Sequence, residues 1–316
     1  MGVVFPLGKI RDRINNLRLY ANNMNDRVIY SFIVDRHPKF AYQAWQLAAS
    51  IVRHCKARPR DINIQITPGV ADHVWSIFSD QGYSVRALTP FGDGTFCNKL
   101  AQIPNLTDTE CGRIVLLDTD MVAVSDCRPL LTHDGVMAKV VDNANPKLNV
   151  LQDMIVAAGG ADVSLMEVEV NTQLTVRGNA NGGFYAMPRH LAARFNGEWQ
   201  RWAKWIFDND GILRAAGRMK NVDQISAALA FNLSGIPYAA APSNLNYFLH
   251  MDGGHKYYDP GHDICFLHYH DVSMNAAGVI ETKIALSPLE QDAVDAANRH
   301  IREGNHARLL RDYMNA

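Results

Sequence analysis

Two aspartates, Asp118 and Asp120, lie between two apolar stretches, Arg113–Leu117 and Met121–Val124. An aliphatic run this short is typical of an interior strand, and a parallel sheet places functional groups at the carboxyl ends of its strands. Two carboxylates there can hold a divalent cation, and a cation can neutralise a diphosphate. The pair therefore indicates chemistry on a nucleotide-linked substrate. The alternative is two solvated loop acids.

The same spacing occurs again at Asp208 and Asp210. This second pair follows Trp202 and Trp205 at helical spacing and precedes Gly211. Such a pattern is typical of the solvated end of a helix. We therefore expect no site at this pair.

The elements that must position the first pair alternate between strand and helix. Strands are predicted at 27–34, 61–66, 83–88 and 113–117. Helices are predicted from Pro38 to about Cys55, from Pro68 to Gly82, and, as a short helix, around 98–103. This order predicts an α/β fold, a doubly wound Rossmann-like sheet with helices on both faces. Ligands are then expected beyond the strand ends.

The second half of the chain has a less regular pattern. A strand is predicted at 136–141, and about forty residues of weak periodicity follow it before the Gly-rich segment at 181–187. The later elements are predicted as helices at 188–208 and 222–232, a strand at 264–268, and a final helix from about Ser287. A loop of forty residues in a compact domain is either functional or contains further elements.

Composition limits the class of protein. The chain has 316 residues, 47% of them hydrophobic, and a net charge of −1, which supports a substantial core and gives no field that favours nucleic acid. The five cysteines are scattered, without a Cys-x-x-Cys pair, as in reduced proteins. No leader or membrane-spanning stretch is visible. We expect a cytoplasmic protein that does not bind nucleic acid.

The two ends of the chain carry basic residues beside apolar ones. Residues 1–26 are predicted to form an N-terminal helical extension with Lys9 and Arg13, and residues 272–316 a C-terminal helical segment with Arg308 and Arg311. Either could rest peripherally on the anionic inner face of a membrane. The alternative is an ordinary amphipathic helix that covers a core.

Five short motifs carry a family resemblance. In order they are Phe96–Leu100, Arg113–Asp120, Asn181–Phe184, Val222–Gln224 and Phe266–Tyr269. Their order resembles the GT-A fold nucleotide-sugar glycosyltransferases, and within them the retaining glycogenin-like and lipopolysaccharide galactosyltransferase-like group, family 8. The resemblance covers residues 27–271 and implies a single catalytic domain of this fold flanked by the terminal helices. Five motifs in family order are more specific than any one of them.

The resemblance implies a metal centre. Asp118, Asp120 and His268 would be the ligands, and Thr119 would contact the donor. Oxygen ligands with one imidazole suit Mn²⁺ or Mg²⁺, of which Mn²⁺ tolerates nitrogen better. The alternative for His268 is a hydrogen-bonded core histidine.

The resemblance also implies residues that bind the nucleotide-sugar donor. Val34 and Asp35 would recognise the base, usually uracil, and Lys99 would meet the diphosphate or the sugar as a point charge. Asn181 and Gly182 would line the donor sugar. The alternatives are a helix-capping acid for Asp35, a surface lysine for Lys99 and a relaxed turn at the glycine.

Asp223 and Gln224 would lie beside the transferred sugar and carry the catalytic roles. The Asp223 carboxylate can accept hydrogen bonds from sugar hydroxyls. The Gln224 amide oxygen can face the positive charge that develops at the anomeric carbon. The alternative is an ordinary helix start, where the helix dipole favours an acid.

One segment departs from the family pattern. Relatives place a glycine and then Lys-Pro-Trp shortly after the metal-binding histidine, whereas this chain has no lysine between His268 and Met274. Either another donor, such as His270 or the more distant Lys283, would then meet the diphosphate, or the contact with the leaving group is weaker. Retention remains the expected stereochemistry, and Asp252 is the acid to test as the general base of an inverting enzyme.

The resemblance implies a metal-dependent transferase that moves a sugar from a UDP-sugar to a carbohydrate or glycolipid acceptor. A sugar-1-phosphate nucleotidyltransferase would share the sheet but needs a glycine-rich loop after the first strand, which residues 35–39 lack. A phosphatase would place its acidic pair on an early strand. A non-catalytic nucleotide-sugar-binding protein is the third alternative.

Overall fold

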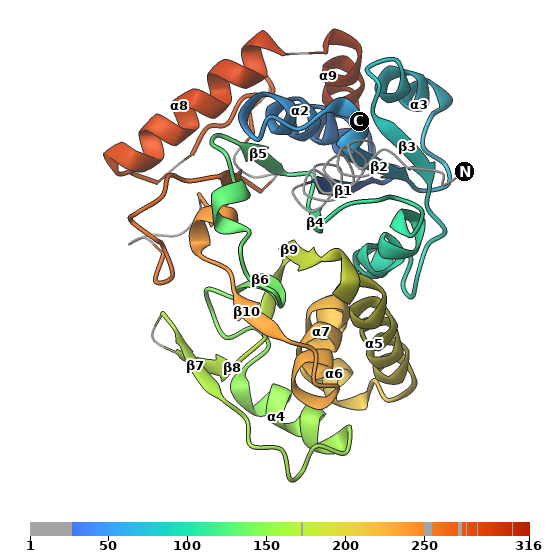
Figure 1. Cartoon of the computed structure of the whole chain (residues 1–316), viewed down its shortest axis with the longest axis vertical. Helices are drawn as coiled ribbons and strands as arrows, with labels where there is room; N and C mark the ends of the chain where they lie inside the picture. Colours follow the sequence, from blue (N-terminus) through green and yellow to red (C-terminus); the bar gives the residue numbers. More distant parts are fainter. Residues whose placement is uncertain are drawn as a thin grey trace, which may run out of the picture.

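A mixed seven-stranded sheet forms the centre of the molecule (Figure 1). The computed structural model describes residues 27–171, 173–249, 255–270, 274–275, 277–282, 284–304 and 306–316. The strand order is β10-β6-β9-β4-β1-β2-β3, and β9 alone runs antiparallel to its neighbours β4 and β6. The strands are β1 (Val28–Val34), β2 (Ile62–Ile66), β3 (Ser84–Ala87), β4 (Arg113–Leu117), β6 (Val136–Val140), β9 (Ala180–Pro188) and β10 (Tyr238–Ala240).

Helices cover both faces of this sheet, as the alternating pattern predicted. Helices α2 (Pro38–His54) and α3 (Asp72–Ser79) pack on one face, and α5 (Arg189–Asp208) and α7 (Val222–Leu233) pack on the other. Figure 1 shows α2 and α5 on opposite sides of the sheet. Successive residues of β4 alternate between the two cores, so its whole apolar run is buried. A strand buried on both faces has no polar alternation.

Two of the predicted boundaries in the first half are wrong. Helix α3 begins at Asp72 rather than Pro68, because Gly69 adopts a φ of 90° and turns the chain after the proline. In place of the one short helix predicted around 98–103, the chain forms two 3₁₀ helices, η2 (Phe96–Ala101) and η3 (Ile103–Leu106). Pro104 lies within the first turn of η3 and prevents one continuous helix.

The forty residues of weak periodicity contain three elements that the pattern did not reveal. They are α4 (Leu148–Ala157) and an antiparallel pair formed by β7 (Glu167–Val170) and β8 (Gln173–Val176). The short helix α6 (Gly211–Ala215) was also missed. Each strand of the pair has four residues, which is too short for a period to be visible in the sequence.

A small second sheet lies beside the first and positions His268. It contains β5 (Met121–Ala123), β11 (Tyr247–Phe248) and β12 (Phe266–His268), with β12 in the middle. Strand β12 runs antiparallel to β5, so that His268 pairs with Met121. The Ala123 amide donates to the Ser50 hydroxyl of α2 over 3.0 Å. This sheet therefore fixes His268 close to the residue that follows Asp120.

The C-terminal segment forms two helices rather than one. They are α8 (Pro288–Glu303), which begins with a capping box at Ser287, and α9 (Ala307–Met314). The rings of Tyr42 in α2 and Tyr313 in α9 stack with centroids 5.6 Å apart. Four further 3₁₀ helices complete the described elements: η1 (Pro59–Asp61), η4 (Arg128–Leu130), η5 (Met219–Asn221) and η6 (Ser243–Leu245).

The predicted membrane contact finds no support in the C-terminal helices. Ile301 and Leu309 are buried in the core, and Leu310 packs against it, so the apolar side of this segment covers protein. The basic N-terminal stretch, residues 1–26, lies outside the part of the chain that the structure describes. None of the helices that the structure does describe is long and apolar enough to cross a membrane.

Candidate functional site

One cavity of about 570 Å³ collects nearly all the residues that the sequence singled out. It opens where β1 and β4 end, as expected for an α/β sheet. Its lining includes Asp35, Lys99, Asp118, Thr119, Asp120, Asn181, Gly182, Asp223, Gln224, His268 and His270. Val34 is the exception, since its side chain lies in the core and the neighbouring Ile33 lines the cavity.

Asp118, Asp120 and His268 form a group that could hold a metal ion. Their ligand atoms all lie within 4.8 Å of one another. The His268 Nε2 atom is 3.2 Å from the Asp120 Oδ1 atom. Two carboxylates and one imidazole, at the edge of a cavity, are a donor set that suits Mn²⁺.

A chain of hydrogen bonds fixes the orientation of the His268 ring. The Asn181 Oδ1 atom accepts two hydrogen bonds, from the Gly183 amide over 2.8 Å and from the Asn246 Nδ2–H over 3.0 Å. The Asn246 Oδ1 atom then faces the His268 Nδ1 atom at 2.8 Å. Because an amide oxygen can only accept, Nδ1 carries the proton.

This arrangement leaves the His268 Nε2 atom directed at the Asp120 carboxylate. With the proton on Nδ1, a neutral ring presents a lone pair to a carboxylate oxygen, and two acceptors repel each other. Either a second proton on the ring or a cation between the two groups removes that repulsion. A ligating histidine usually has its other nitrogen held in this way. The residues present therefore fit a metal ion.

Asp120 is ionised in this environment. Burial by itself would raise the pKa of the Asp120 carboxyl, but the neighbouring rings of His268 and His270 lower that pKa to well below its ordinary value. The hydroxyl of Thr119, between the two aspartates, donates to Gln43 of α2 over 3.3 Å. The turn that carries both carboxylates is thus tied to the helix behind it.

Lys99 is buried and joins two parts of the site. Its ammonium group forms an ion pair with Asp118 and donates to the Gly182 carbonyl oxygen. A surface lysine, the alternative to the predicted role, would be solvated, whereas Lys99 is 6% exposed. The residue places a positive charge between the metal-binding pair and the predicted sugar-binding segment.

The two glycines of the Asn181–Phe184 motif are needed for close packing. A Cβ atom on Gly182 would lie 2.9 Å from a carboxylate oxygen of Asp223. One on Gly183 would lie 2.8 Å from the Cε1 atom of His268. Since β9 runs between these side chains, any larger residue would displace them.

Asp223 and Gln224 begin helix α7. The Asp223 carbonyl accepts the Trp199 indole N–H over 2.7 Å, which anchors the first turn on α5. Burial raises the pKa of the Asp223 carboxyl to about 7, although the nearby Lys99 opposes the shift. A helix start that needed only a favourable charge would leave this acid solvated.

His268 and His270 both face the cavity, but not through an extended strand. Strand β12 ends at His268, and His270 adopts a φ of 52°, so the backbone is not extended through His270. The left-handed turn nevertheless brings the two rings into a parallel stack, with centroids 3.9 Å apart. The Phe248 ring lies nearly perpendicular to both of them, in a T-shaped contact with each.

Several cavity residues had no predicted role. Phe96 is 58% exposed on the wall, and an exposed aromatic ring offers a surface for a base or a sugar. Lys39 and Lys220 add two cations, and Asn145 and Asn221 add amides. Sequence patterns could not reveal these residues because they come from loops and helix ends far apart in the chain.

The residues that the sequence set aside remain outside this cavity. Helix α5 ends at Asp208, and Asp210 pairs with Arg214 at 2.5 Å, as expected for a solvated helix end. Neither aspartate lines the cavity. Asp252 and Lys283, named for the inverting alternative and for the missing lysine, lie outside the described residues.

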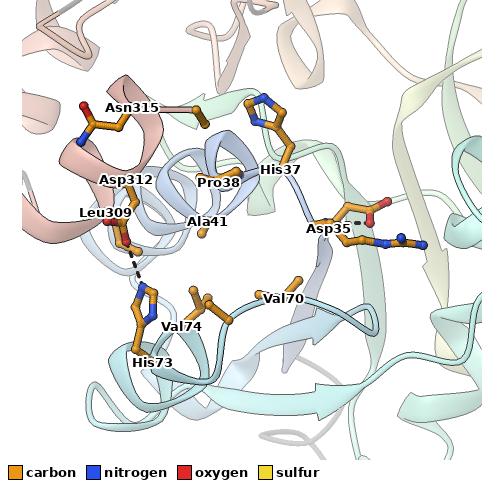
Figure 2. A pocket seen from close by; sticks show the side chains of 13 residues that line it. Asp35, His37, Pro38, Ala41, Val70, His73, Val74, Leu309, Asp312 and Asn315 are labelled. Carbon is orange, nitrogen blue, oxygen red and sulfur yellow. Dashed lines mark hydrogen bonds and ion pairs between the residues drawn. The ribbon is translucent and has the colours of Figure 1, made fainter.

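A second cavity, of about 400 Å³, lies between α2, α3 and α9 (Figure 2). His73 and Asp312 form an ion pair on its wall, with 2.9 Å between Nε2 and Oδ2. Asp35 lines both cavities and accepts the Thr67 hydroxyl over 2.8 Å. No other predicted donor-binding residue reaches the second cavity.

Comparisons with known proteins establish the fold. No protein-family model and no curated protein match the sequence. Among solved structures, an active-site mutant of LgtC, with glutamate in place of a glutamine, is similar over 85% of this chain and 95% of that one, at 13% identity and a TM-score of 0.50. This chain has a GT-A type fold.

Two further glycosyltransferase structures are also similar. The galactosyltransferase LgtC in complex with donor and acceptor sugar analogues matches 87% of this chain and 99% of its own, at 15% identity and a TM-score of 0.46. Mouse xyloside xylosyltransferase 1 matches 78% of this chain and 98% of its own, at 10% identity and a TM-score of 0.45.

Proposed function

We propose that this protein is a metal-dependent glycosyltransferase that moves a sugar from a UDP-sugar to a hydroxyl of a carbohydrate or glycolipid acceptor. The observation that carries the proposal is the convergence, in one cavity of the GT-A type fold, of a three-ligand metal group, a buried lysine and the Asp223–Gln224 pair. Solvated loop acids and helix-end residues would not converge in this way.

Asp118, Asp120 and His268 would hold Mn²⁺ or Mg²⁺ at the edge of the cavity. When bound, the cation supplies neutralisation of the negative charge on the leaving diphosphate. Lys99, already between Asp118 and Gly182, contributes a second positive charge on the donor side. The motif lysine of the family is missing after His268, and His270, Lys39 or Lys220 on the cavity wall would take its place.

The sugar would lie between β9 and the start of α7. Asp223 would accept hydrogen bonds from its hydroxyls, and Asn181 and Gly182 would contact its other side. The Gln224 amide would present its oxygen to the positive charge that builds at the anomeric carbon. Asn221 donates to that oxygen over 3.5 Å and so helps to direct it.

Retention of configuration is the proposed stereochemistry. A glutamine beside the anomeric carbon supplies charge stabilisation but no base, so the departing phosphate oxygen would accept the proton of the acceptor hydroxyl. An inverting enzyme needs a general base on the acceptor side. Asp35 and the residues around it would bind the base of the nucleotide. A cytoplasmic location is proposed because all five cysteines are unpaired.

The first experiment is a thermal-shift panel of nucleotide sugars with and without Mn²⁺. A ligand that binds only the folded state raises the melting temperature according to its affinity. We expect a UDP-sugar to give the largest shift, and only when Mn²⁺ is present. An equal shift without the ion would remove the metal from the proposal.

The second experiment measures nucleotide release and identifies the product. A glycosyltransferase releases UDP from the donor, a nucleotidyltransferase releases pyrophosphate from UTP and a sugar 1-phosphate, and a binding protein shows affinity without turnover. Proton NMR of the transferred sugar then reports its anomeric configuration. Pyrophosphate release, or saturable binding without turnover on a broad panel of acceptors, would contradict the proposed activity.

A further inference from the structure

A cluster of thiols lies at the opposite end of the β5–β12 pair from Asp120 and His268. Cys127 follows β5 and Cys265 immediately precedes β12, while Cys55 caps the C-terminus of α2. All three are reduced and buried. The proposed chemistry of the catalytic cavity uses none of them. Two sets of described residues have a spacing that could hold a metal ion. One is the group of Asp118, Asp120 and His268, and the other consists of Cys55 and Cys127 from this cluster with Asp126.

The distances within the cluster match those of a tetrahedral ion. The Sγ atoms of Cys55 and Cys127 are 3.7 Å apart, and the ligand atoms of Cys55, Asp126 and Cys127 all lie within 4.8 Å of one another. Zinc–sulfur bonds of about 2.3 Å at tetrahedral angles place two sulfur atoms about 3.8 Å apart. The two thiols therefore stand at the separation that such an ion requires.

We propose that Cys55, Asp126 and Cys127 bind a structural zinc ion. Thiolate ligands select zinc over the harder cations that suit an all-oxygen site. Binding would release the two thiol protons to solvent and would change no oxidation state. The Asp126 carboxylate faces the guanidinium of Arg128, with 2.5 Å between Oδ2 and Nη2.

The charges of the occupied site balance. Two thiolates and one carboxylate carry three negative charges, and the zinc ion and Arg128 carry three positive charges. An uncompensated charge beside the buried sulfur atoms would be unfavourable, so this balance favours an occupied site.

The fourth coordination position is assigned to water. Cys55 lines a cavity of about 420 Å³, which also reaches Tyr30 and Arg128 and gives the cluster a path to solvent. The cavity wall is basic and would repel a cation. Asp61 pairs with both Arg27 and Arg58, each at 2.7 Å, and so reduces the positive potential of the wall. A zinc ion would enter through this opening.

Cys265 is close to the group without belonging to it. Its thiol donates to the backbone carbonyl oxygens of Asp126 at 3.7 Å and Asp263 at 3.6 Å. It therefore serves as a matched buried control for the two proposed thiol ligands. Cys111, which is partly exposed and lies on the chain before β4, is a second control.

The ion would cross-link the end of α2 to the turn after β5. The same two elements already meet at Ser50 and Ala123, whose hydrogen bond measures 3.0 Å. Because β5 begins directly after Asp120, a cross-link at its far end would hold the small sheet on α2 without contacting the catalytic cavity. The expected consequence is thermal stability rather than turnover.

The test is a cobalt titration of the full-length protein, followed by absorbance. Cobalt bound to thiolates gives an intense charge-transfer band in the near ultraviolet. The Asp118, Asp120 and His268 group contains no sulfur and gives no such band. We expect one equivalent of cobalt to develop the band in the parent, and zinc to displace it. Absence of the band in the reduced parent would overturn the proposal.

The variants identify the ligands. Cys55→Ser and Cys127→Ser should each lose at least half of the band, whereas Cys265→Ser and Cys111→Ser should keep it. Asp126→Asn keeps both thiols, so it should retain the band and weaken cobalt binding by about tenfold or more. This variant remains informative if a cysteine variant fails to fold. A band that survives Cys55→Ser and Cys127→Ser together, or disappears in Cys265→Ser, would overturn the assigned ligand set.

Discussion

Asp118 and Asp120 have the same spacing as Asp208 and Asp210, but the two pairs lie in different surroundings. The first pair lies in the turn between β4 and β5, where His268 completes a group that could hold a metal ion and Lys99 reaches Asp118. The second pair ends α5, and its Asp210 pairs only locally with Arg214. Both pairs are partly exposed to solvent. The capacity to bind a metal therefore comes from the elements that meet at the pair, and not from the spacing.

The largest expected effect separates the two pairs directly. Asp120→Ala should abolish Mn²⁺-dependent donor hydrolysis and transfer, because it removes a proposed ligand of the ion that would stabilise the leaving diphosphate. Replacement of both Asp208 and Asp210 by alanine should leave turnover within a few-fold of the parent, since exposed pairs contribute about 0.3–0.5 kcal/mol to stability. The measurement is UDP release at saturating Mn²⁺. Equal losses in the two variants would contradict the assignment.

The next prediction concerns the side chains around the donor. Gln224→Ala should lower kcat far more than it weakens donor binding, by about 100-fold, because its contact strengthens as charge builds in the transition state. Lys99→Ala should weaken donor binding as well as turnover. Steady-state kinetics with thermal-shift affinities separate the two effects. A Gln224 variant with lower affinity but unchanged kcat would show that the residue only binds the donor.

The stacked histidines sharpen the definition of the metal-binding group. His268→Ala should raise the Mn²⁺ concentration for half-maximal activity by about tenfold or more. Metal affinity falls by at least that factor even when only a residue that supports a ligand is removed. His270→Ala should reduce turnover and leave that concentration nearly unchanged. A metal titration of both variants provides the comparison. The opposite pattern would transfer the ligand role to His270.

Asn246 offers a finer test of the same group. Asn246→Leu keeps the volume of the side chain but removes the oxygen that holds the His268 Nδ1 proton. We expect Mn²⁺ affinity to fall by about tenfold, while kcat at saturating Mn²⁺ stays within a few-fold of the parent. Asn246→Asp, which restores an acceptor, should recover most of that affinity. A purely structural asparagine would change the melting temperature alone.

The last prediction concerns the pH dependence of stability at Asp223, which needs no substrate or metal. Because the pKa of this buried acid is raised from 3.8 to about 7, the native state binds more protons than the unfolded chain between these values, and stability falls as pH rises through them. At pH values above 7, Asp223→Asn should therefore increase the free energy of unfolding by at most about 4 kcal/mol, which is measured as a higher melting temperature.

That gain should be nearly gone at pH 4, where the native-state acid is protonated and the unfolded-state acid, with a pKa of about 3.9, is close to half protonated. The matched control is Asp208→Asn, which makes the same substitution at an acid that is exposed at a helix end. Thermal unfolding of the donor-free proteins between pH 4 and pH 8 gives both curves. A gain for Asp223→Asn that is the same at every pH would contradict the role of burial.

The fold of the first half could be predicted because its elements are long and locally consistent. The strands predicted at 27–34, 61–66 and 113–117 are β1, β2 and β4 within one residue, and the predicted helix after Pro38 is α2. The second half could not be predicted to the same degree. Helix α4 and the β7–β8 pair are short, and their stability comes from contacts that no local period records.

The sequence by itself determined that an apolar strand ends in two carboxylates, and that a histidine ends a later strand. Both facts are local, because burial and period decide where a strand stops. Only the tertiary structure decided that Asn246 directs the His268 ring from 22 residues away and that Cys55 meets Cys127 across 72 residues. Contacts at such separations depend on how sheets and helices pack against one another, and local sequence patterns do not reveal that packing.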